Sequence, residues 1–417
     1  MCPKIRPPRA RWLPRTVLPG GQGQRSFTHN DHPESSAEGA VRFVVVTAPS
    51  DIIVIGAGIV GCSIAYELAR RGASVQIVDD RPAGMGATQA SAGVLAPYIE
   101  AREEGPLLEL TARSLDLFEQ FVARVTAASD ISIMYRRSGT LDVAMDEETM
   151  GRFRAASGAL AARGVAAELF DARDARTEEP HLNGDVLGGL LIPSHGFVAA
   201  ADLTRALAAA ARRHGAQLIE HGRAVRISSS HGDLVVVTDR GSLIGNGVVV
   251  AAGSWSGQIE IEGVAARVPV RPVRGQLLYL AWNGPLLGRV IWSERCYLVP
   301  WEDGTVLVGA TVEEAGFDER TTTVGVRDLI DAACELVPQA RTAAFMAAKA
   351  GLRPASADEL PVIGPSSVVP NIMYATGHYR NGVLLAPLTA QLVADAILEN
   401  RFDPLLAATS PQRFGVL

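Results

Sequence analysis

Residues 51–80, DIIVIGAGIVGCSIAYELARRGASVQIVDD, constrain the fold of this chain more than any other segment. The apolar, β-branched run DIIVI predicts a strand that is buried on both faces. Gly56, Gly58 and Gly61 follow at GxGxxG spacing. In that motif the first glycine permits a tight turn, the second admits a pyrophosphate to the backbone, and the third lets the next helix pack on the strand. The segment therefore predicts a βαβ dinucleotide site.

The residues around the glycines support this interpretation. A helix with small or apolar residues follows them, Gly72 ends it, and SVQIV predicts the second strand. Asp79 closes that strand, where a carboxylate can accept hydrogen bonds from a ribose diol. A GxGxxG match alone also occurs in plain glycine-rich turns, but here the strand, the helix and the acid all agree with a nucleotide site.

Length and composition set further bounds. A chain of 417 residues predicts about two domains, and 47% hydrophobic with 20% charged residues is ordinary for a soluble enzyme. We find no apolar run of the ~18 residues that a membrane span needs, so we predict no membrane span. The four cysteines form no CxxC pair and the eight histidines no metal spacing, which predicts free thiols, a reducing cytoplasm and no metal site.

The charge is unevenly distributed. Residues 1–30 hold six basic residues and no acid, so that the net charge of −6 leaves −12 on the remaining 387 residues. An acidic body argues against nucleic-acid binding, which needs a basic face. The proline-rich residues 1–45 predict a disordered extension, and a transit peptide, a tail without function and a misplaced start codon remain open for it.

The rest of the chain alternates helical and extended patterns. We expect helices over 106–125, 203–214, 326–337 and 387–399, the second capped by Asp202 and ended by Gly215. We expect a strand over 139–145 and a strand meander over 216–253, and we interpret 371–397 as a strand, a glycine-bounded turn and a long apolar helix. No second GxGxxG has a strand before it and a helix after it, which favours one tightly held flavin over a flavin with NAD(P)H.

Over residues 51–400 the chain resembles the FAD-dependent D-amino-acid oxidase family, and within it the glycine oxidase branch that serves thiamine biosynthesis. The resemblance rests on IGAGIVG, ASAGVLAPY, VVVAAGSWSG, RGQLLYL, CYLVP, VGAT, AGLRPASADELPVIG and ATGHYRNGVLLAP. It implies an α/β fold in which a discontinuous, Rossmann-type FAD-binding domain carries a substrate domain with a mixed, largely antiparallel sheet. The division that we expect is 46–100, 200–265 and 350–410 for FAD, and 101–199 and 266–349 for the substrate.

The resemblance also implies individual roles. AGLRPASADELPVIG contains no cysteine, so we expect non-covalent FAD. Arg353 matches the arginine that binds the substrate carboxylate, Arg380 a second substrate-contacting arginine, and Tyr297 a tyrosine that lines the pocket. The alternatives are a surface ion pair for Arg353, a flavin or solvent contact for Arg380 and a plain core position for Tyr297. The cofactor residues expected from the motif and the resemblance are Gly56, Gly58, Ile59, Val60, Gly61, Asp79, Asp80, Ala87, Thr88, Ala92, Gly93, Val94, Val225, Gly377, His378, Tyr379, Arg380, Asn381, Gly382, Val383 and Leu384.

The resemblance implies oxidation of glycine or another small amine or D-amino acid by hydride transfer to flavin, with no catalytic acid or base. The expected acceptor is O2, which gives H2O2, and the imine product is expected to be handed to a thiazole synthase. The alternatives are a dehydrogenase of the same fold that reduces a quinone or partner protein, a tRNA-modifying flavoprotein, and a flavin protein without turnover. A cytoplasmic homo-oligomer is also expected.

Overall fold

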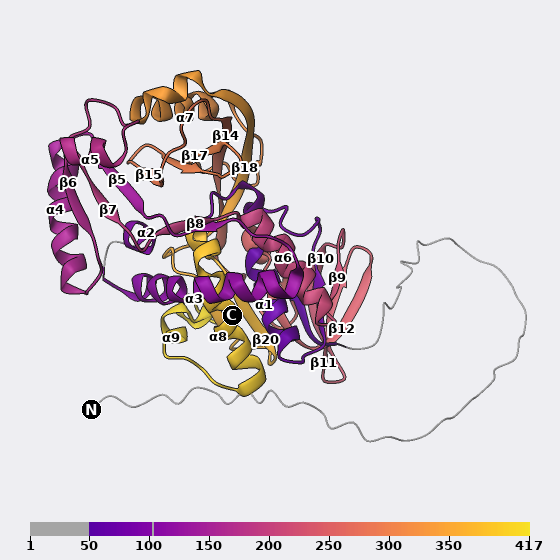
Figure 1. Cartoon of the computed structure of the whole chain (residues 1–417). Helices are drawn as coiled ribbons and strands as arrows, with labels where there is room; N and C mark the ends of the chain where they lie inside the picture. Colours follow the sequence, from indigo (N-terminus) through magenta and orange to yellow (C-terminus); the bar gives the residue numbers. More distant parts are fainter. Residues whose placement is uncertain (1–49, 102–103) are drawn as a thin grey trace, which may run out of the picture.

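The computed structural model describes residues 50–101 and 104–417, and the extension expected over 1–45 lies outside them. Two large sheets dominate the described residues, and Figure 1 shows the second sheet above the first. A three-stranded sheet in the order β3-β8-β4 is also present in this part of the protein. Its strands are β3 (Val94–Leu95), β8 (Gly196–Val198) and β4 (Tyr135–Arg136).

The first sheet is built around the predicted βαβ unit. β1 pairs in parallel with β2 and β12, β2 with β9, and β12 with β20, as in a doubly wound nucleotide-binding sheet. The antiparallel run β10-β11-β12 is the predicted meander, which returns the chain to the centre of the sheet. The strands are β1 (Ser50–Ile55), β2 (Val75–Val78), β9 (Gln217–Ile219), β10 (Ala224–Ser230), β11 (Asp233–Thr238), β12 (Gly241–Val250), β13 (Glu260–Ile261), β19 (Val362–Pro365) and β20 (Ile372–Thr376).

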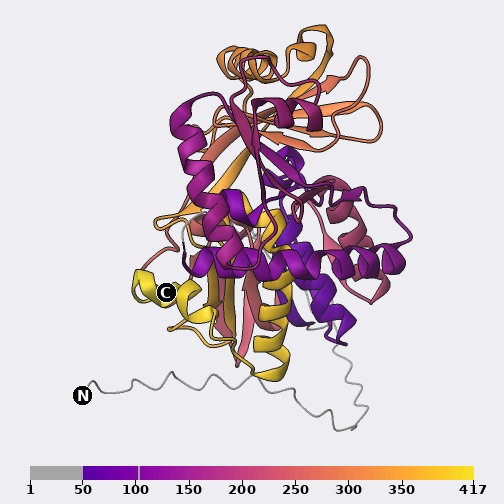
Figure 2. The same ribbon diagram turned by 60° about the vertical axis from the view of Figure 1, so that its left-hand side comes forward.

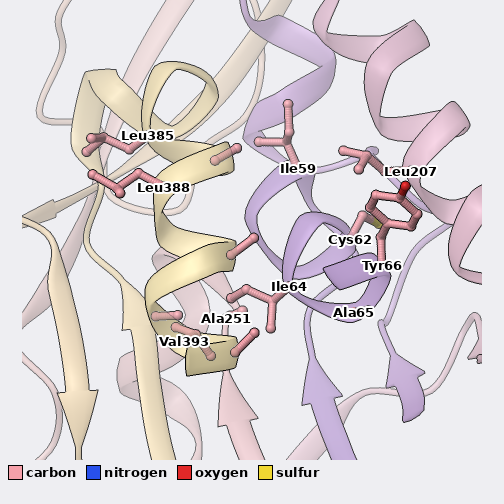
Figure 3. Packing of buried hydrophobic residues seen from close by; sticks show 14 of the residues in the cluster. Ile59, Cys62, Ile64, Ala65, Tyr66, Leu207, Ala251, Leu385, Leu388 and Val393 are labelled. Carbon is pink, nitrogen blue, oxygen red and sulfur yellow. The ribbon is translucent and has the colours of Figure 1, made fainter. Parts of the chain in front are cut away.

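Four helices pack with this sheet in one hydrophobic core. α1 contacts both α6 and α8, and α3 packs against the same two helices. Figure 3 shows α1 between its two neighbours, with Cys62 and Tyr66 near Leu207 of α6. These helices are α1 (Ile59–Arg70), α3 (Pro106–Ser129), α6 (Ala200–Arg213) and α8 (Gly382–Glu399).

The second sheet is mixed and largely antiparallel, as expected. Its order is β18-β14-β17-β16-β15-β5-β7-β6, and the single parallel pair in it joins β15 to β5. Helix α7 covers β14 and β17, while α4 and α5 lie beside β6 and β7 (Figure 2). The strands are β5 (Thr140–Ala144), β6 (Glu168–Asp171), β7 (Gly188–Ile192), β14 (Val270–Ala281), β15 (Val290–Trp292), β16 (Tyr297–Pro300), β17 (Thr305–Gly309) and β18 (Ala344–Ser356).

The other elements are short connections and the helices of the second sheet. They are α2 (Pro97–Glu100), α4 (Glu147–Ala162), α5 (Ala172–Glu178), α7 (Thr323–Leu336), α9 (Leu406–Thr409), and the 3₁₀ turns η1 (Ala87–Ala90), η2 (Gly253–Gln258), η3 (Pro338–Thr342), η4 (Tyr379–Asn381) and η5 (Pro411–Phe414).

One helix start differs from the prediction. α6 begins at Ala200 with Ala199 as its N-cap, so Asp202 lies inside the first turn and bonds Arg205 instead. An acid in the first turn is favourable there as well, because it faces the positive end of the helix dipole. The prediction of Asp202 as the N-cap was therefore wrong.

The expected division into domains stays a prediction, and two elements pack across it. α3 falls in the range expected for the substrate domain but packs in the core of the first sheet. β18 crosses the expected boundary at residue 350 and forms the edge of the second sheet.

Within the described residues, one helical stretch has the length and apolarity of a membrane span. It covers Tyr379–Glu399, which includes α8, and 83% of its apolar window is buried inside the structure. Burial in the core accounts for its composition. Sequence inspection overlooked this stretch because Thr389, Gln391 and Asp395 interrupt the apolar run. The absence of a membrane span stays a prediction.

Candidate active site

A cleft in the described part of the protein lies where the first sheet meets the second. It is open at its mouth, and with the space at the mouth included it holds about 1820 Å³. Both the N-terminus of α1 and the N-terminus of α8 line it. The expected cofactor residues that line it are Gly56, Gly58, Ile59, Val60, Asp79, Asp80, Ala87, Thr88, Ala92, Gly93, Val94, His378, Tyr379, Arg380, Asn381, Gly382 and Val383.

The glycines of the βαβ unit have distinct local geometries. Gly56 turns the chain with φ of 108°, a left-handed conformation that favours glycine. Gly61 does not line the cleft, and a Cβ there would lie 1.9 Å from the carbonyl oxygen of Gly56. The absence of a side chain at Gly61 therefore lets α1 approach β1 closely enough to place its N-terminus at the cleft.

Two helices point their N-termini into the same cleft. The N-cap residues are Gly58 for α1 and Asn381 for α8, and neither provides a side-chain cap. Backbone N–H groups and the positive ends of both helix dipoles are thus directed at one space, which favours a ligand that carries negative charge at two places. The N-terminus of α1, which follows the glycine-rich turn, is the setting that a dinucleotide diphosphate needs.

Asp79 is fixed by the backbone at the nucleotide end of the cleft. Its Oδ2 accepts from the Ala57 N–H at 2.6 Å and its Oδ1 from the Arg81 N–H at 2.8 Å. Burial raises the pKa of Asp79, while the two backbone donors oppose the rise. The carboxylate keeps further lone pairs for a ribose diol.

Four expected residues lie outside the cleft lining. Gly61 packs against the carbonyl of Gly56, and Gly377 turns the chain before α8 with φ of 71°. Leu384 is buried, and its carbonyl accepts from the Ser114 hydroxyl of α3. Val225 is 38% exposed at an irregularity in the pairing of β10, and the segment 222–224 lines the cleft in its place.

Arg353 belongs to β18, and its guanidinium forms hydrogen bonds to backbone carbonyls. Its guanidinium lies over Gly275 and donates to the carbonyl of Thr311 at 2.9 Å and, at 3.5 Å, to that of Arg274. Within residues 50–101 and 104–417, no carboxylate lies within 4.0 Å of it. A planar cation in a cleft without a counterion suits a carboxylate ligand.

Tyr297, at the start of β16, borders the same part of the cleft. Its ring centre lies 4.8 Å from that of Trp292, and its hydroxyl packs over Gly309. Burial raises the pKa of Tyr297 and Arg353 opposes the rise, so the phenol stays protonated at neutral pH and can donate a hydrogen bond.

Arg380 lines the cleft but is already engaged. Its Nε lies 2.9 Å from Oε2 of Glu100 and its Nη2 lies 3.0 Å from Oε1, so both carboxylate oxygens are bound by one guanidinium. Glu100 ends α2 and also lines the cleft. The expected substrate contact of Arg380 therefore competes with an ion pair, which sequence reasoning did not anticipate.

Sequence reasoning also missed the tryptophans of the cleft. Trp255 lies in η2 and Trp292 ends β15, and both line it. The signal for Trp255 was present in GVVVAAGSWSG, where the strand, the glycine and the aromatic residue follow one another.

The thiols near the cleft do not favour a covalent cofactor. Cys62 donates to the Ala57 carbonyl at 3.3 Å, and burial raises its pKa to about 12. Burial also raises the pKa of Cys296 to about 12. A thiol of such high pKa is a poor nucleophile. Among the described residues that line the cleft, none is a cysteine.

A sheet with a parallel βαβ unit, a glycine-rich turn, two helix N-termini and a ribose acceptor at one cleft is typical of dinucleotide-binding oxidoreductases. The chain belongs to the FAD dependent oxidoreductase family, whose model matches residues 51–396. FAD is its cofactor, and two helix N-termini and the Asp79 carboxylate lie at the cleft to bind it.

Individual relatives agree with this assignment. The bifunctional protein ThiO/ThiG of Synechocystis is 34% identical over 88% of this chain, which spans 54% of that relative, so the chain covers about half of the length of the bifunctional relatives. A glycine oxidase of Geobacillus kaustophilus is 33% identical over 85% of this chain and 94% of its own length. The crystal structure of glycine oxidase from Geobacillus kaustophilus matches with a TM-score of 0.84 at 32% identity, covering 88% of this chain and 99% of that one.

Proposed function

We propose that this enzyme oxidises glycine, or another small amine or D-amino acid such as sarcosine or D-alanine, to the corresponding imine, which hydrolyses to the 2-oxo acid. The observation that carries the proposal is Arg353, a cation in the cleft whose hydrogen bonds go to backbone carbonyls. Names of relatives support it, because several proteins about one third identical to this chain are named glycine oxidase.

Different residues of the cleft contact different parts of the substrate. Arg353 holds the substrate carboxylate through its planar fork, and Tyr297 offers a phenol O–H on the same side. FAD, when bound, accepts the hydride that leaves the substrate α-carbon. Anchoring the carboxylate fixes where the α-carbon lies, so the protein contributes mainly proximity and orientation.

Trp292 and Tyr297 limit the size of the substrate. Their rings lie 4.8 Å apart beside Arg353, and Trp292 is 7% exposed. Two packed aromatic rings next to the carboxylate anchor leave room for small substituents on the α-carbon. A small amino acid fits this arrangement better than one with a long side chain.

We propose further that O2 reoxidises the flavin and that the imine serves the thiazole ring of thiamine. The fusion named ThiO/ThiG supports this, because it joins a domain similar to this chain to a second protein in one polypeptide. A hand-off to a thiazole synthase, a homo-oligomer and a cytoplasmic location are part of the same proposal, as is non-covalent FAD.

The test is to mix the oxidised holoenzyme, in the absence of oxygen, with glycine, sarcosine, D-alanine and D-phenylalanine as a bulky comparison, and to follow flavin absorbance. We expect bleaching with the small substrates. Admitting O2 in a stopped-flow instrument should then restore the oxidised spectrum rapidly and produce H2O2. Bleaching followed by slow recovery in O2 would favour the dehydrogenase, and no bleaching with any of these amines would contradict the proposal.

A further inference from the structure

The segment that connects β17 to α7, residues 310–322, reaches from the second sheet to the nucleotide end of the cleft. It is anchored to β14 at several points. Arg274, a buried side chain, pairs with Glu313 at 2.5 Å and with Asp318 at 3.0 Å. Gln276 donates to the Glu313 carboxylate at 2.7 Å. The segment is therefore held in place by buried polar contacts of its own sheet.

From this position the segment contacts residues of the first sheet. Both carboxylate oxygens of Glu319 accept from Arg81, at 2.9 and 2.7 Å. The guanidinium carbon of Arg81 lies 4.6 Å from the centre of the Trp255 ring, and the Phe317 ring lies 5.8 Å from that same ring. We call Arg81, Trp255, Phe317 and Glu319 the clasp.

The clasp stands at the nucleotide end of the cleft. Arg81 follows Asp79 by two residues, and its backbone N–H binds that carboxylate. Arg81 and Trp255 line the cleft, whereas Phe317 and Glu319 reach them from outside the lining. The clasp therefore joins the two sheets across the part of the cleft that holds the ribose acceptor.

We propose that the clasp is a retention latch for FAD, which sets how fast the cofactor dissociates. FAD leaves when the contact between residues 310–322 and Arg81 opens, because this contact bridges the cleft beside the adenosine half. A partly exposed ion pair is usually weak, but this pair is bidentate and its cation also stacks on an indole ring, which strengthens it.

The test is a double-mutant cycle on the purified holoenzyme. Arg81→Gln, Glu319→Gln and the double variant are diluted, and the rise of free FAD fluorescence gives the dissociation rate. Each single variant should release FAD about three- to ten-fold faster than the parent. The double variant should release it no faster than Arg81→Gln, because the two residues act as one contact.

A matched control is an ion pair that joins the same segment to β14. Arg271 forms an exposed ion pair with Glu314, and neither residue lines the cleft. Arg271→Gln should leave the FAD dissociation rate unchanged, although it removes an ion pair of residues 310–322. Arg81→Lys keeps the charge without the fork, and should give a rate between those of the parent and Arg81→Gln.

Two further readouts separate a latch from general weakening of the fold. High salt should speed FAD release from the parent and affect Glu319→Gln less, because screening weakens the ion pair only where it exists. The melting temperature of the apoprotein should fall no further for Glu319→Gln than for Arg271→Gln, which also removes one ion pair of this segment. Unchanged dissociation rates in both single variants, or single effects that add fully in the double variant, would overturn the proposal.

Discussion

Arg353 and Arg380 line one cleft but differ in their electrostatic state. Arg353 donates to backbone carbonyls, while Glu100 binds Arg380 through both oxygens. A carboxylate ligand at Arg353 gains a charge-assisted contact without displacing another acid. At Arg380 the same ligand competes with Glu100, so the two arginines contribute unequally to substrate binding.

Arg353→Ala should keep FAD bound and lose most activity. The substrate carboxylate loses a bidentate contact, and the α-carbon of the substrate loses its fixed position. The transition state therefore loses about 2–4 kcal/mol of stabilisation, which lowers kcat/KM roughly thirty- to a thousand-fold. Steady-state kinetics with glycine and sarcosine check this. Arg353→Lys should recover only part of the loss, because an ammonium lacks the planar fork.

The control for this prediction is Arg380→Ala together with an amine that has no carboxylate. Arg380→Ala should have the smaller effect on kcat/KM, since Glu100 already neutralises that side chain. The amine without a carboxylate should react poorly, and equally so, with the parent and with Arg353→Ala. Near-normal kcat/KM for glycine in Arg353→Ala would mean that Arg353 is not the anchor.

The sequence could indicate Arg353 but not the state of Arg380. Arg353 belongs to a motif, AGLRP, whose residues are adjacent in the chain. The partner of Arg380 is 280 residues away on α2, and only the tertiary fold brings Glu100 to it. Val225 shows the same limit, because an irregular pairing in β10 decides which backbone atoms of this strand face the cleft.

At the scale of elements, the contact of α1 with β1 places the first helix N-terminus. Gly61→Ala should lower both FAD content and stability, because its Cβ would lie 1.9 Å from the Gly56 carbonyl oxygen and the helix would have to shift. Overpacking of this kind costs about 1–3 kcal/mol. The ratio of FAD to protein and the free energy of unfolding in denaturant measure the two effects.

Gly151→Ala is the matched control for Gly61→Ala. Gly151 lies inside α4, and a Cβ there would meet nothing within 4 Å. Alanine is the better helix former by about 0.5–1 kcal/mol, so this variant should be as stable as the parent or more stable. A Gly61→Ala variant that kept full FAD content would show that the close approach of α1 is dispensable.

α8 contains Pro387, and α3 compensates for the disturbance of the helix. The Ser114 hydroxyl donates to the Leu384 carbonyl at 2.6 Å and accepts from the Leu388 N–H at 3.4 Å, one on each side of the proline. Ser114→Ala should lower the free energy of unfolding by about 1–3 kcal/mol, because buried backbone groups lose a partner. Denaturant unfolding measures the change.

Ser63→Ala is the comparison for Ser114→Ala. The Ser63 hydroxyl is equally buried but bonds the Ile59 carbonyl one turn back in its own helix, so its removal breaks no contact between helices. We expect a smaller loss of stability than for Ser114→Ala. Equal losses in the two variants would argue against a special role of Ser114 at the proline.

Local sequence patterns predicted the elements well where the contacting residues are close in the sequence. The βαβ unit, the meander and the strand before α8 follow from periodicity and glycines that are close in sequence. The domain in which α3 packs could not be predicted in this way. An amphipathic stripe indicates that a helix packs on one face, but it does not indicate which sheet the helix contacts. The start of α6 was missed because an acid suits both the N-cap and the first turn.

At the scale of the whole molecule, the cleft depends on how two sheets meet, and its opposite sides come from distant parts of the sequence. The nucleotide end comes from β1, β2 and β12, and the substrate end from β16 and β18. The family resemblance predicted this architecture. The contacts across the cleft, including the pair of Arg81 with Glu319, required the three-dimensional structure.

Two histidines are buried without charge in this fold. His195 is fully buried and stacks on Tyr98, and burial, assisted by Arg137, lowers its pKa to about 3. His378 bonds Thr389 at 3.1 Å, and burial lowers its pKa to about 4. Both side chains titrate near pH 6.5 in the unfolded state.

The unfolded state therefore binds more protons than the folded state between about pH 6.5 and pH 4, so stability must fall as the pH falls through this range. Each histidine should remove about 2 kcal/mol from the free energy of unfolding between pH 8 and pH 5. Glu313 and Asp358 are acids whose pKa values are lowered in the folded state. Their contribution to the free energy of unfolding is lost only when the pH falls below their ordinary pKa values, near 4.5 and 3.8. Denaturant unfolding of the FAD-saturated enzyme from pH 8 to pH 5 should show the decline, and His195→Gln should show a shallower one. A decline of the same slope in His195→Gln would exclude His195 as a source of the acid sensitivity.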